Sequence, residues 1–438
     1  MTELTAPTPY RRSGPGPTFA IGLNLCLLGI YTNFAVKVGG SFAPGVPVVA
    51  GAILLLPHMV SNKRSLLWLG WLFIFLTVSL VAGGSGAEFF GDRLPSWFQI
   101  VVALSCAHII LCAMNYPEKV RKILFIWLMF IVVGIILETV FSPLRDLSNE
   151  FRNVVFEGRF IYAGDARDLQ DYGFVRPKLF TQEPSHVAKA FIVFGAGWYV
   201  LSSSRRRLGV LLICTVLVTV FLGSPFGLLV LPVAWLLSRM ASKAHLFKLF
   251  AAGIPVVGLI AIALTQLFSA RFEKILSGTD ASFFSRFQGP YEVALGSLEQ
   301  YPIFGVGIGA KEALQETVLT AYGLYFGSRS NQTWLSQNYL TILSNGFANS
   351  ISFFGLAGAA VFFILLAQWM KGFGITAAVS LPVILLFFQL DGAFEGLRMW
   401  GSLAVILGCY LMASRCSPQR VETSTITSGA VETHPAVR

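Results

Sequence analysis

The stretch ILFIWLMFIVVGIILETVFS, residues 123–142, decides the fold class, and Glu138 is its one charged side chain. A helix rises 1.5 Å per residue, so about 20 apolar residues cross the hydrocarbon of a bilayer. Apolar runs of similar length recur from residue 18 to residue 414. The chain is 55% hydrophobic and 12% charged, whereas a soluble domain has roughly 25% charged residues. We therefore expect an all-α polytopic membrane protein.

The apolar runs predict about twelve transmembrane helices. Gly223-Ser224-Pro225 either separates two short spans or kinks a single one, and the second alternative would move everything after it to the other side of the membrane. The expected spans are residues 18–37, 43–59, 65–83, 97–114, 123–142, 185–202, 208–222, 226–239, 249–268, 350–368, 375–390 and 399–414.

Lysine and arginine are distributed unevenly between the short connections. With the N-terminus inside, twelve of them lie in internal connections and three in external ones, as the positive-inside rule requires. Arg11 and Arg12 precede a first apolar run that is too long for a signal peptide and has no small-residue cleavage site, which indicates a retained first helix. Both termini are expected to be cytoplasmic. The internal residues are Lys63, Arg64, Lys119, Arg121, Lys122, Arg205, Arg206, Arg207, Arg239, Lys243, Lys248 and Lys371, and the external ones are Lys37, Arg93 and Arg398.

Two segments are too long and too polar to be turns, and both are expected outside: residues 143–184, the first outer segment, and residues 269–349, the second outer segment. The remaining parts are a tail over 1–17, spans 1–5 over 18–142, spans 6–9 over 185–268, spans 10–12 over 350–414 and a disordered tail over 415–438. The net charge of +10 is not accompanied by a nucleic-acid-binding motif, and the six cysteines have no metal-ligand spacing.

The end of the first outer segment concentrates ionisable groups at the entry to the sixth span. Arg176, Lys178, Glu183 and His186 lie within eleven residues. A guanidinium presents a planar fork of donors that matches phosphate oxygens, so this segment is a candidate anion site. The alternative is that Arg176 and Lys178 contact lipid headgroups or water.

Glu183 and His186 are three residues apart, and Pro184 suits the start of a helix. If the sixth helix begins there, the two side chains lie near its first turn. They are then either an acid/base pair or a helix N-terminal carboxylate beside an interfacial histidine.

The second outer segment has three notable parts. Tyr291, Ala294, Leu295 and Leu298 recur with helical period, which predicts a short amphipathic helix from 290 to 300 with Arg286 before its start. The glycine-rich run 302–309 lacks the spacing and the βαβ context of a nucleotide loop and is interpreted as a turn or a close backbone contact. The amide-rich residues 331–349 suit sugar hydroxyls and equally suit a solvated loop.

Three motifs resemble the O-antigen ligase and polymerase superfamily. They are Ser285-Arg286 before a short helix, followed by the run Tyr301-Pro302-Ile303-Phe304-Gly305-Val306-Gly307-Ile308-Gly309; Arg176 to Phe180 with Glu183-Pro184-Ser185 leading into a span; and Ala348-Asn349 before Gly355 and Gly358. The resemblance covers most of the chain. It implies a fold like the GT-C glycosyltransferases, in a bacterial inner membrane, and glycosyl transfer from undecaprenyl-diphosphate-linked oligosaccharide on the periplasmic face without metal or other cofactor.

The resemblance also implies residue roles. Arg176 and Arg286 match the arginines that bind the diphosphate, and Lys178 and Arg159 are further candidates. Reasoning from the reaction, we expect Arg286 to act in catalysis, with Glu183 the first candidate for the base and His186 the second. Asn338 and Asn349 are candidate sugar ligands.

Ligases that attach O-antigen to lipid A core resemble one another in carrying a histidine in the second outer segment, and here no histidine lies between 246 and 433. A polymerase of O-antigen or exopolysaccharide repeats is therefore preferred, with a ligase, a flippase or other transporter, or a non-catalytic assembly protein as alternatives. The lipid bilayer is an expected partner, as are a chain-length regulator and a flippase of an export machine.

Overall fold

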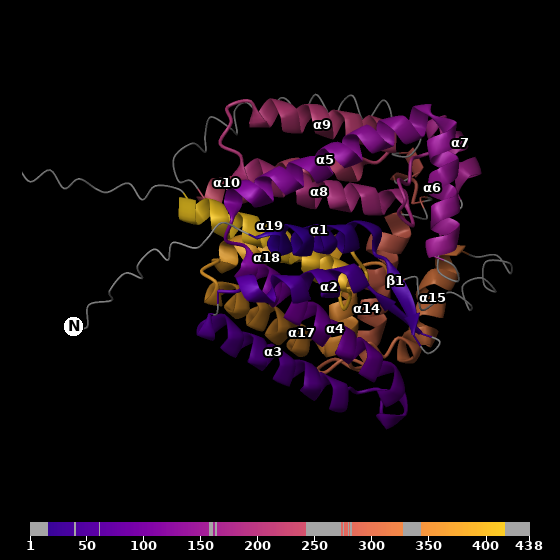
Figure 1. Cartoon of the computed structure of the whole chain (residues 1–438). Coiled ribbons are helices and arrows are strands. Elements are labelled where there is room, and N and C mark those ends of the chain that lie inside the picture. Colours follow the sequence, from indigo (N-terminus) through magenta and orange to yellow (C-terminus); the bar gives the residue numbers. More distant parts are fainter. Residues whose placement is uncertain are drawn as a thin grey trace, which may run out of the picture.

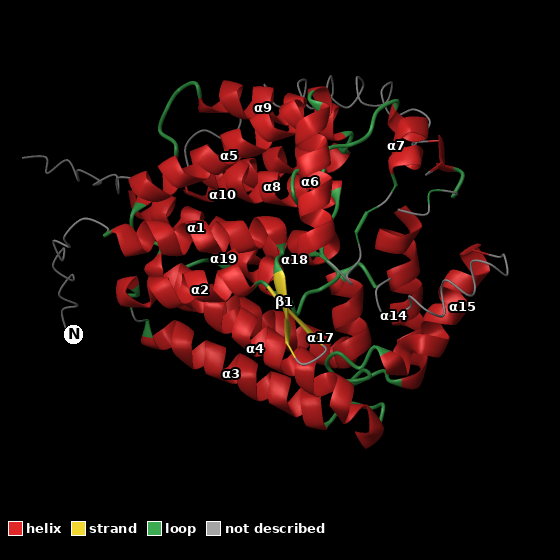
Figure 2. Cartoon of the chain, turned by 45° about the vertical axis from the view of Figure 1, so that its right-hand side comes forward, coloured by secondary structure: helices red, strands yellow, loops and turns green. Residues whose placement is uncertain are grey.

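The computed structural model describes residues 16–416 except for 39–40, 61, 157–160, 163, 242–272, 275, 279, 281–282 and 327–342. Within these residues the chain is helical apart from one short hairpin (Figures 1 and 2). Long helices lie side by side in a stack that runs from α9 through α5, α8, α19 and α4 to α3, and α17 packs against α3.

The N-terminal half contains α1 (Pro17–Thr32), β1 (Ala35–Val38), β2 (Ser41–Pro44), α2 (Val46–Leu55), η1 (Leu56–His58), α3 (Lys63–Val81), η2 (Ala87–Phe89), α4 (Phe90–Ala113), α5 (Pro117–Val140), α6 (Ser142–Val155), α7 (Asp165–Tyr172) and α8 (Pro184–Leu201). The C-terminal half contains α9 (Arg207–Leu222), η3 (Pro225–Leu229), α10 (Val230–Ala241), η4 (Phe284–Gln288), α14 (Gly289–Gln300), η5 (Glu312–Leu314), α15 (Gln315–Phe326), α17 (Gly346–Gly372), α18 (Ala377–Leu390) and α19 (Leu397–Cys416).

Among the described residues, five helices are long and apolar enough to cross a membrane: α4 together with η2, and α3, α5, α17 and α19. Shorter apolar helices occupy five further positions where the sequence predicts a span, and α8 occupies a sixth. The expected span 249–268 lies outside the described residues. The sequence is therefore right about helical, membrane-type architecture.

The expectation of helix over residues 33–37 is wrong. Helix α1 ends at Thr32 with Asn33 in the left-handed conformation, and β1 then pairs with β2 as an antiparallel hairpin. The sequence has two consecutive glycines, Gly39-Gly40, between the two strands, and a two-residue glycine connection favours such a hairpin. The hairpin shortens both flanking helices.

Helices α8 and α19 form the centre of the stack. They pack against each other, and nearly every residue of α8 from Pro184 to Val200 and of α19 from Leu397 to Met412 is buried. A helix that is buried around its whole circumference has no face left for lipid or water. The polar side chains at the ends of α8 and α19 therefore lie in the interior of the molecule.

Helix α17 is broken at Gly355, whose φ of 67° and ψ of 179° are open essentially to glycine alone. The missing helical bond between Ser352 and Leu356 is replaced from outside: Val306 N donates to Ser352 O at 3.0 Å, and Leu356 N donates to Pro302 O at 3.2 Å. The glycine-rich run predicted to make a close backbone contact thus fills this break. The contact ties the end of α14 to α17.

Candidate functional site

Helix α8 begins at Pro184 as the sequence predicts, and its first turns present Glu183, His186 and Lys189 at intervals of three residues. The His186 Nε2 atom lies 3.3 Å from Glu183 Oε1. Positions three apart in sequence are neighbours on a helix surface. The expected closeness of Glu183 and His186 is confirmed, and Lys189 extends the row by one turn.

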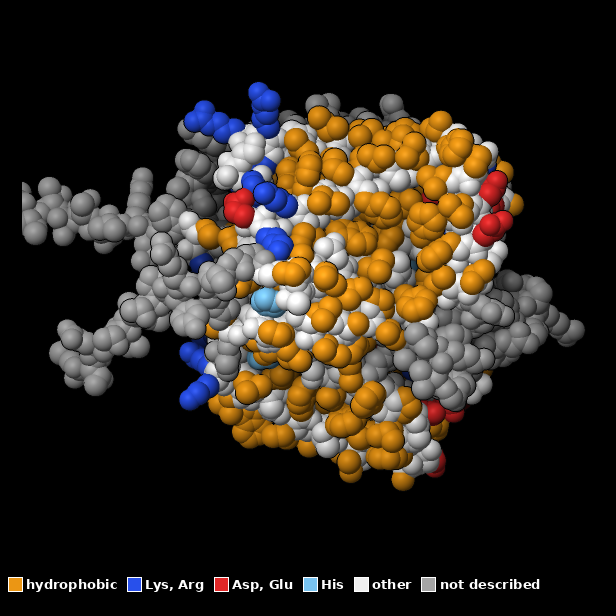
Figure 3. Space-filling model, in the orientation of Figure 1, with side chains coloured by type: hydrophobic (Ala, Val, Ile, Leu, Met, Phe, Trp, Pro, Cys, Tyr) orange, Lys and Arg blue, Asp and Glu red, His pale blue; other side chains and the backbone are white. Residues whose placement is uncertain are grey.

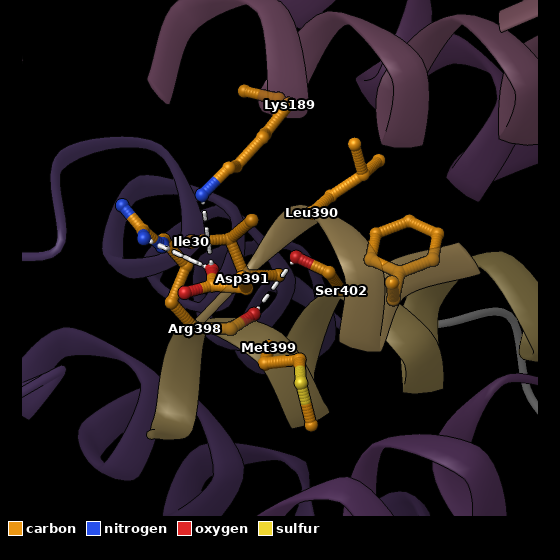
Figure 4. Close-up of a pocket in the computed structure, with 9 residues that line it drawn as sticks. Ile30, Lys189, Leu390, Asp391, Arg398, Met399 and Ser402 are labelled. Carbon is orange, nitrogen blue, oxygen red and sulfur yellow. Dashed lines mark hydrogen bonds and ion pairs between the residues drawn. The ribbon is translucent and has the colours of Figure 1, made fainter. Parts of the chain in front are cut away.

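Asp391, the first residue after α18, and Arg398, in the first turn of α19, join this row (Figure 4). Asp391 lies 3.5 Å from Lys189 Nζ and accepts hydrogen bonds from Arg398 Nη2 at 2.9 Å and Nε at 3.2 Å. Burial alone would raise the pKa of Asp391, but the charges of Arg398 and Lys189 lower it to about 2. Asp391 is therefore an ionised centre that holds two cations.

Arg286, in the second outer segment, contributes a positive charge that lowers the pKa of Glu183. Burial would raise the pKa of Glu183, yet the positive charges of Arg286, Lys189 and Arg398, together with a hydrogen bond from Ser185, hold that pKa below its usual value. Glu183 is thus a carboxylate and not a carboxylic acid at neutral pH. We call Glu183, His186, Lys189, Arg286, Asp391 and Arg398 the charged cluster.

A widened π-helical turn, Phe284–Gln288, carries Arg286 into the predicted short helix, which the structure has as α14. Such turns re-aim side chains and recur at functional sites. Two neighbours hold the turn: Ser344 Oγ donates to Ser285 O at 2.6 Å, and Asn345 Nδ2 donates to Arg286 O at 2.9 Å. The position of Arg286 is therefore fixed by its backbone.

Asn345 connects three elements of the site. Its side-chain oxygen caps α17 by accepting from Phe347 N and Ala348 N, and its amide nitrogen also donates to Gln389 Oε1 at 2.6 Å. Gln389 in turn donates to the hydroxyl of Tyr291 on α14. One buried amide thus links η4, α17 and the end of α18, two residues before Asp391.

Arg176 and Lys178 form a second group, held by carboxylates of α7. Arg176 Nε pairs with Asp168 at 2.8 Å, and Lys178 Nζ pairs with Asp165 at 2.5 Å. The Arg176 guanidinium also lies over the ring of Tyr172, 4.7 Å from its centre. These two cations are buried and neutralised within the first outer segment, and their binding of diphosphate stays a prediction.

The turn after α9 brings the two groups near each other. Gly223 has a φ of 59°, and a Cβ atom there would meet Arg176 Cδ at 3.1 Å. Three residues later, the ring of Phe226 lies 5.5 Å from the Arg286 guanidinium carbon. The two arginines that the sequence singles out therefore lie on either side of one turn.

A small cavity adjoins the charged cluster. Its volume is about 10 Å³, room for roughly one water molecule. Lys189, Asp391, Arg398 and Ser402 supply its polar lining, and Ile30 and Met399 supply part of its apolar lining (Figure 4). A sugar or a diphosphate cannot fit there, so a large ligand would approach from the Glu183 and Arg286 side.

The remaining residues predicted from the sequence are Asn349, Arg159 and Asn338. Asn349 is buried, and its amide nitrogen donates to Leu343 O and Gly392 O, where it holds the connection that contains Asp391. Arg159 and Asn338 lie outside the described residues. Among the described residues no group of three His, Cys, Asp or Glu side chains could hold a metal ion. The expectation of metal-independent chemistry stays a prediction.

Sequence reasoning did not assign Lys189, Asp391 or Arg398 to a site. A signal was present, because ionisable residues at the ends of apolar spans are costly unless they are paired or used. The pairing itself joins residues about two hundred positions apart, which spacing cannot reveal. No known family model matches the chain, and no curated protein is significantly similar to it.

Proposed function

We propose that the chain is an integral inner-membrane glycosyltransferase that polymerises undecaprenyl-diphosphate-linked oligosaccharide repeats, on the periplasmic face, into O-antigen or exopolysaccharide. The charged cluster is the observation that carries this proposal. It combines three cations with two carboxylates, so at neutral pH it has a surplus of positive charge for an anion. A diphosphate with a sugar is a ligand of that chemistry.

Two atoms in the cluster support a ligand at this position. His186 Nδ1 and Arg398 Nη1 are buried and have no hydrogen-bond partner within the described ranges. Buried polar atoms are nearly always partnered, and an exception calls for a reason such as a bound ligand. A phosphate oxygen or a sugar hydroxyl that enters from the Glu183 and Arg286 side would supply what the His186 nitrogen lacks. The cavity beside Arg398 has room for about one water molecule, which would be a partner for Arg398 Nη1.

The chemistry that we propose needs an anion site and a base. The bond between the anomeric carbon and the diphosphate oxygen breaks while a bond to the attacking sugar hydroxyl forms. Glu183, held as a carboxylate, accepts the hydroxyl proton, a role typically worth about 10²–10⁴ in rate. Arg286, with Lys189 and Arg398, offsets the charge that develops on the departing diphosphate.

We propose twelve spans with both termini cytoplasmic and a GT-C-like arrangement, and the surface supports the membrane placement and the orientation. Figure 3 shows a broad belt of hydrophobic side chains with lysine and arginine gathered at one end of the molecule. Exposed Arg64, Lys122, Arg205 and Arg206 lie at the starts of α3, α5 and α9. The charged cluster lies at the other end, where α5 finishes and α8 begins.

The test is polymerisation by the purified protein. The wild type in detergent receives the organism's lipid-diphosphate-linked repeat unit without added metal or nucleotide, and a gel should show a ladder of longer glycans. Arg286→Ala should reduce the rate by about 10²–10³, the cost of losing one charge-stabilising donor. Arg286→Lys should also fail, since a point charge does not reproduce a bidentate fork.

Arg205→Ala is the matched control, an exposed arginine at the opposite end that should leave the ladder unchanged. A wild-type ladder from the Arg286→Ala protein would contradict the site. Labelled lipid that crosses a reconstituted bilayer, with no ladder, would replace the polymerase by a transporter.

A further inference from the structure

Helix α6 (Ser142–Val155) has its polar face inside and its apolar face outside. Ser148 and Arg152 are buried, with exposed fractions of 0% and 2%, whereas Leu147, Phe151 and Val154 have exposed fractions of 55%, 39% and 77%. A surface helix in water has the opposite arrangement. With four charged residues among its fourteen, α6 is also too short and too polar to span a membrane.

The buried face binds the segment that leads to Glu183. Arg152 donates to Thr181 O at 2.7 Å and to Gln182 O at 3.0 Å, and Ser148 Oγ accepts from Phe180 N at 2.9 Å. These bonds explain why the polar residues point inward. They also hold α6 and residues 180–182 together.

The exposed half of α6 is divided into two stripes. At 100° per residue, Leu147, Phe151 and Val154 fall within an arc of about 60°. The exposed side chains of Asp146, Glu150 and Asn153 occupy the adjacent arc. The helix therefore has three sides: one bound to protein, one apolar and one polar.

The apolar stripe continues that of α5. Exposed residues on α5 recur every three or four positions at Ile126, Phe130, Val133, Leu137 and Val140. Phe141, 56% exposed, follows directly at the start of α6. Since α5 is long and apolar enough to cross a membrane, its exposed stripe is the surface that lipid would cover.

We infer that α6 lies in the interface of the bilayer, at the end of the bundle that carries Glu183, with Leu147, Phe151 and Val154 in the acyl layer and Asp146 and Glu150 in water. Interfacial helices bury an apolar face about 5–10 Å into the boundary between headgroups and acyl chains. α6 lies crosswise to the end of α5 (Figures 1 and 2), as this placement requires. Through Arg152, the lipid surface then sets the depth of Thr181 and Gln182.

Fluorescent labels on single cysteines test the placement. Cys416 is the exposed native cysteine and the other five are buried, so Cys416→Ser gives a background for selective labelling. In this background Leu147→Cys and Val154→Cys report on the apolar stripe, and Asn153→Cys, next to Val154 in sequence, is the matched control on the polar stripe. Each protein carries an NBD label in nanodiscs of phosphatidylethanolamine and phosphatidylglycerol.

The labels at 147 and 154 should emit at shorter wavelength than the label at 153, and a lipid with a nitroxide high on its acyl chain should quench them more strongly. Iodide in the buffer should show the reverse order. Iodide quenching at 147 and 154 equal to that at 153 would overturn the inference, and so would lipid quenching equal at all three positions. The readout needs no glycosyl transfer, so this inference and the proposed polymerase can fail separately.

Discussion

Arg176 and Arg286 lie on either side of the turn that contains Gly223 and Phe226, yet the structure uses the two guanidiniums differently. Arg176 is paired with the fully buried Asp168, and Lys178 beside it is paired with Asp165, so two cations meet two carboxylates. Arg286 belongs to a cluster in which three cations meet two carboxylates and two buried nitrogens lack partners within the described residues. In the first arrangement each cation is neutralised by a carboxylate within the fold. In the second, one positive charge remains that a bound anion would neutralise.

If that distinction is right, Glu183→Gln should give the largest effect on activity and a small effect on folding. Loss of a positioned base should slow polymerisation by about 10²–10⁴. The variant should still fold in detergent, with a modest fall in its unfolding midpoint, because the lowered pKa of Glu183 means that its charge contributes to stability at neutral pH. Equal rates for the variant and the wild type in the gel assay would remove Glu183 from the mechanism.

The pH dependence of the wild type sharpens the same point. Glu183 must be ionised to accept a proton, so activity that depends on it is complete above its pKa and falls as the pH drops through that pKa. Because the cluster lowers the pKa below the usual 4.5, this group should leave the rate unchanged from about pH 7 to about pH 5. A loss of rate already at about pH 6 would show that another group is the base.

Arg176→Ala should act on stability first. It leaves Asp168 buried without its cation, and breaking a buried ion pair costs about 3–5 kcal/mol. Thermal unfolding of the purified protein should show a large fall in midpoint. Arg167→Ala is the matched control, because Arg167 also donates to Tyr162 but is exposed. A stable Arg176→Ala protein that makes no polymer would contradict the distinction and place Arg176 in the substrate site.

Asp391→Asn should have an intermediate effect. The pKa of Asp391 is lowered from 3.8 to about 2, which corresponds to about 2 kcal/mol of stability at neutral pH. Since the folded-state pKa is the lower one, this contribution is complete above about pH 4 and is lost as the pH falls towards 2. The variant should unfold more easily at pH 7 and lose that part of the pH dependence. Wild-type stability at pH 7 would mean that Asp391 does not hold the two cations.

The smallest effect should come from Gly223→Ala. The left-handed conformation costs a residue with a Cβ about 1–2 kcal/mol, and the new methyl group would also press on Arg176. Gly173→Ala is the matched control, because Gly173 has a similar φ of 76° with nothing within 4 Å of the added carbon. Comparing the two unfolding midpoints isolates the contact, and equal losses would show that Arg176 moves aside without cost.

Local patterns predicted the parts of this molecule that depend on neighbours in sequence. The start of α8 at Pro184, the closeness of Glu183 to His186 and the helix after Arg286 all follow from spacings of a few residues. The membrane-type helices follow from long apolar runs. These features follow from the helical periodicity of neighbouring residues and from hydropathy.

What the sequence did not predict depends on distant partners. Helices α6 and α7 lie in the first outer segment, where no helix was expected, because their polar residues are satisfied by Thr181, Gln182, Arg176 and Lys178 from another part of the segment. The pairing of Lys189 with Asp391 spans about two hundred residues. Whether an arginine ends in a neutral pair or in a charged cluster is decided by such partners.

The break in α17 has a consequence for the order of folding. A segment inserted into a membrane as one helix needs all its backbone groups satisfied from within, but α17 leaves the Ser352 carbonyl and the Leu356 amide to be satisfied by Val306 and Pro302. The two halves of α17 can therefore reach their final form only when the second outer segment has already docked. Completion of this helix therefore depends on the run of residues 302–306, which follows α14 and so lies in the same outer segment as Arg286.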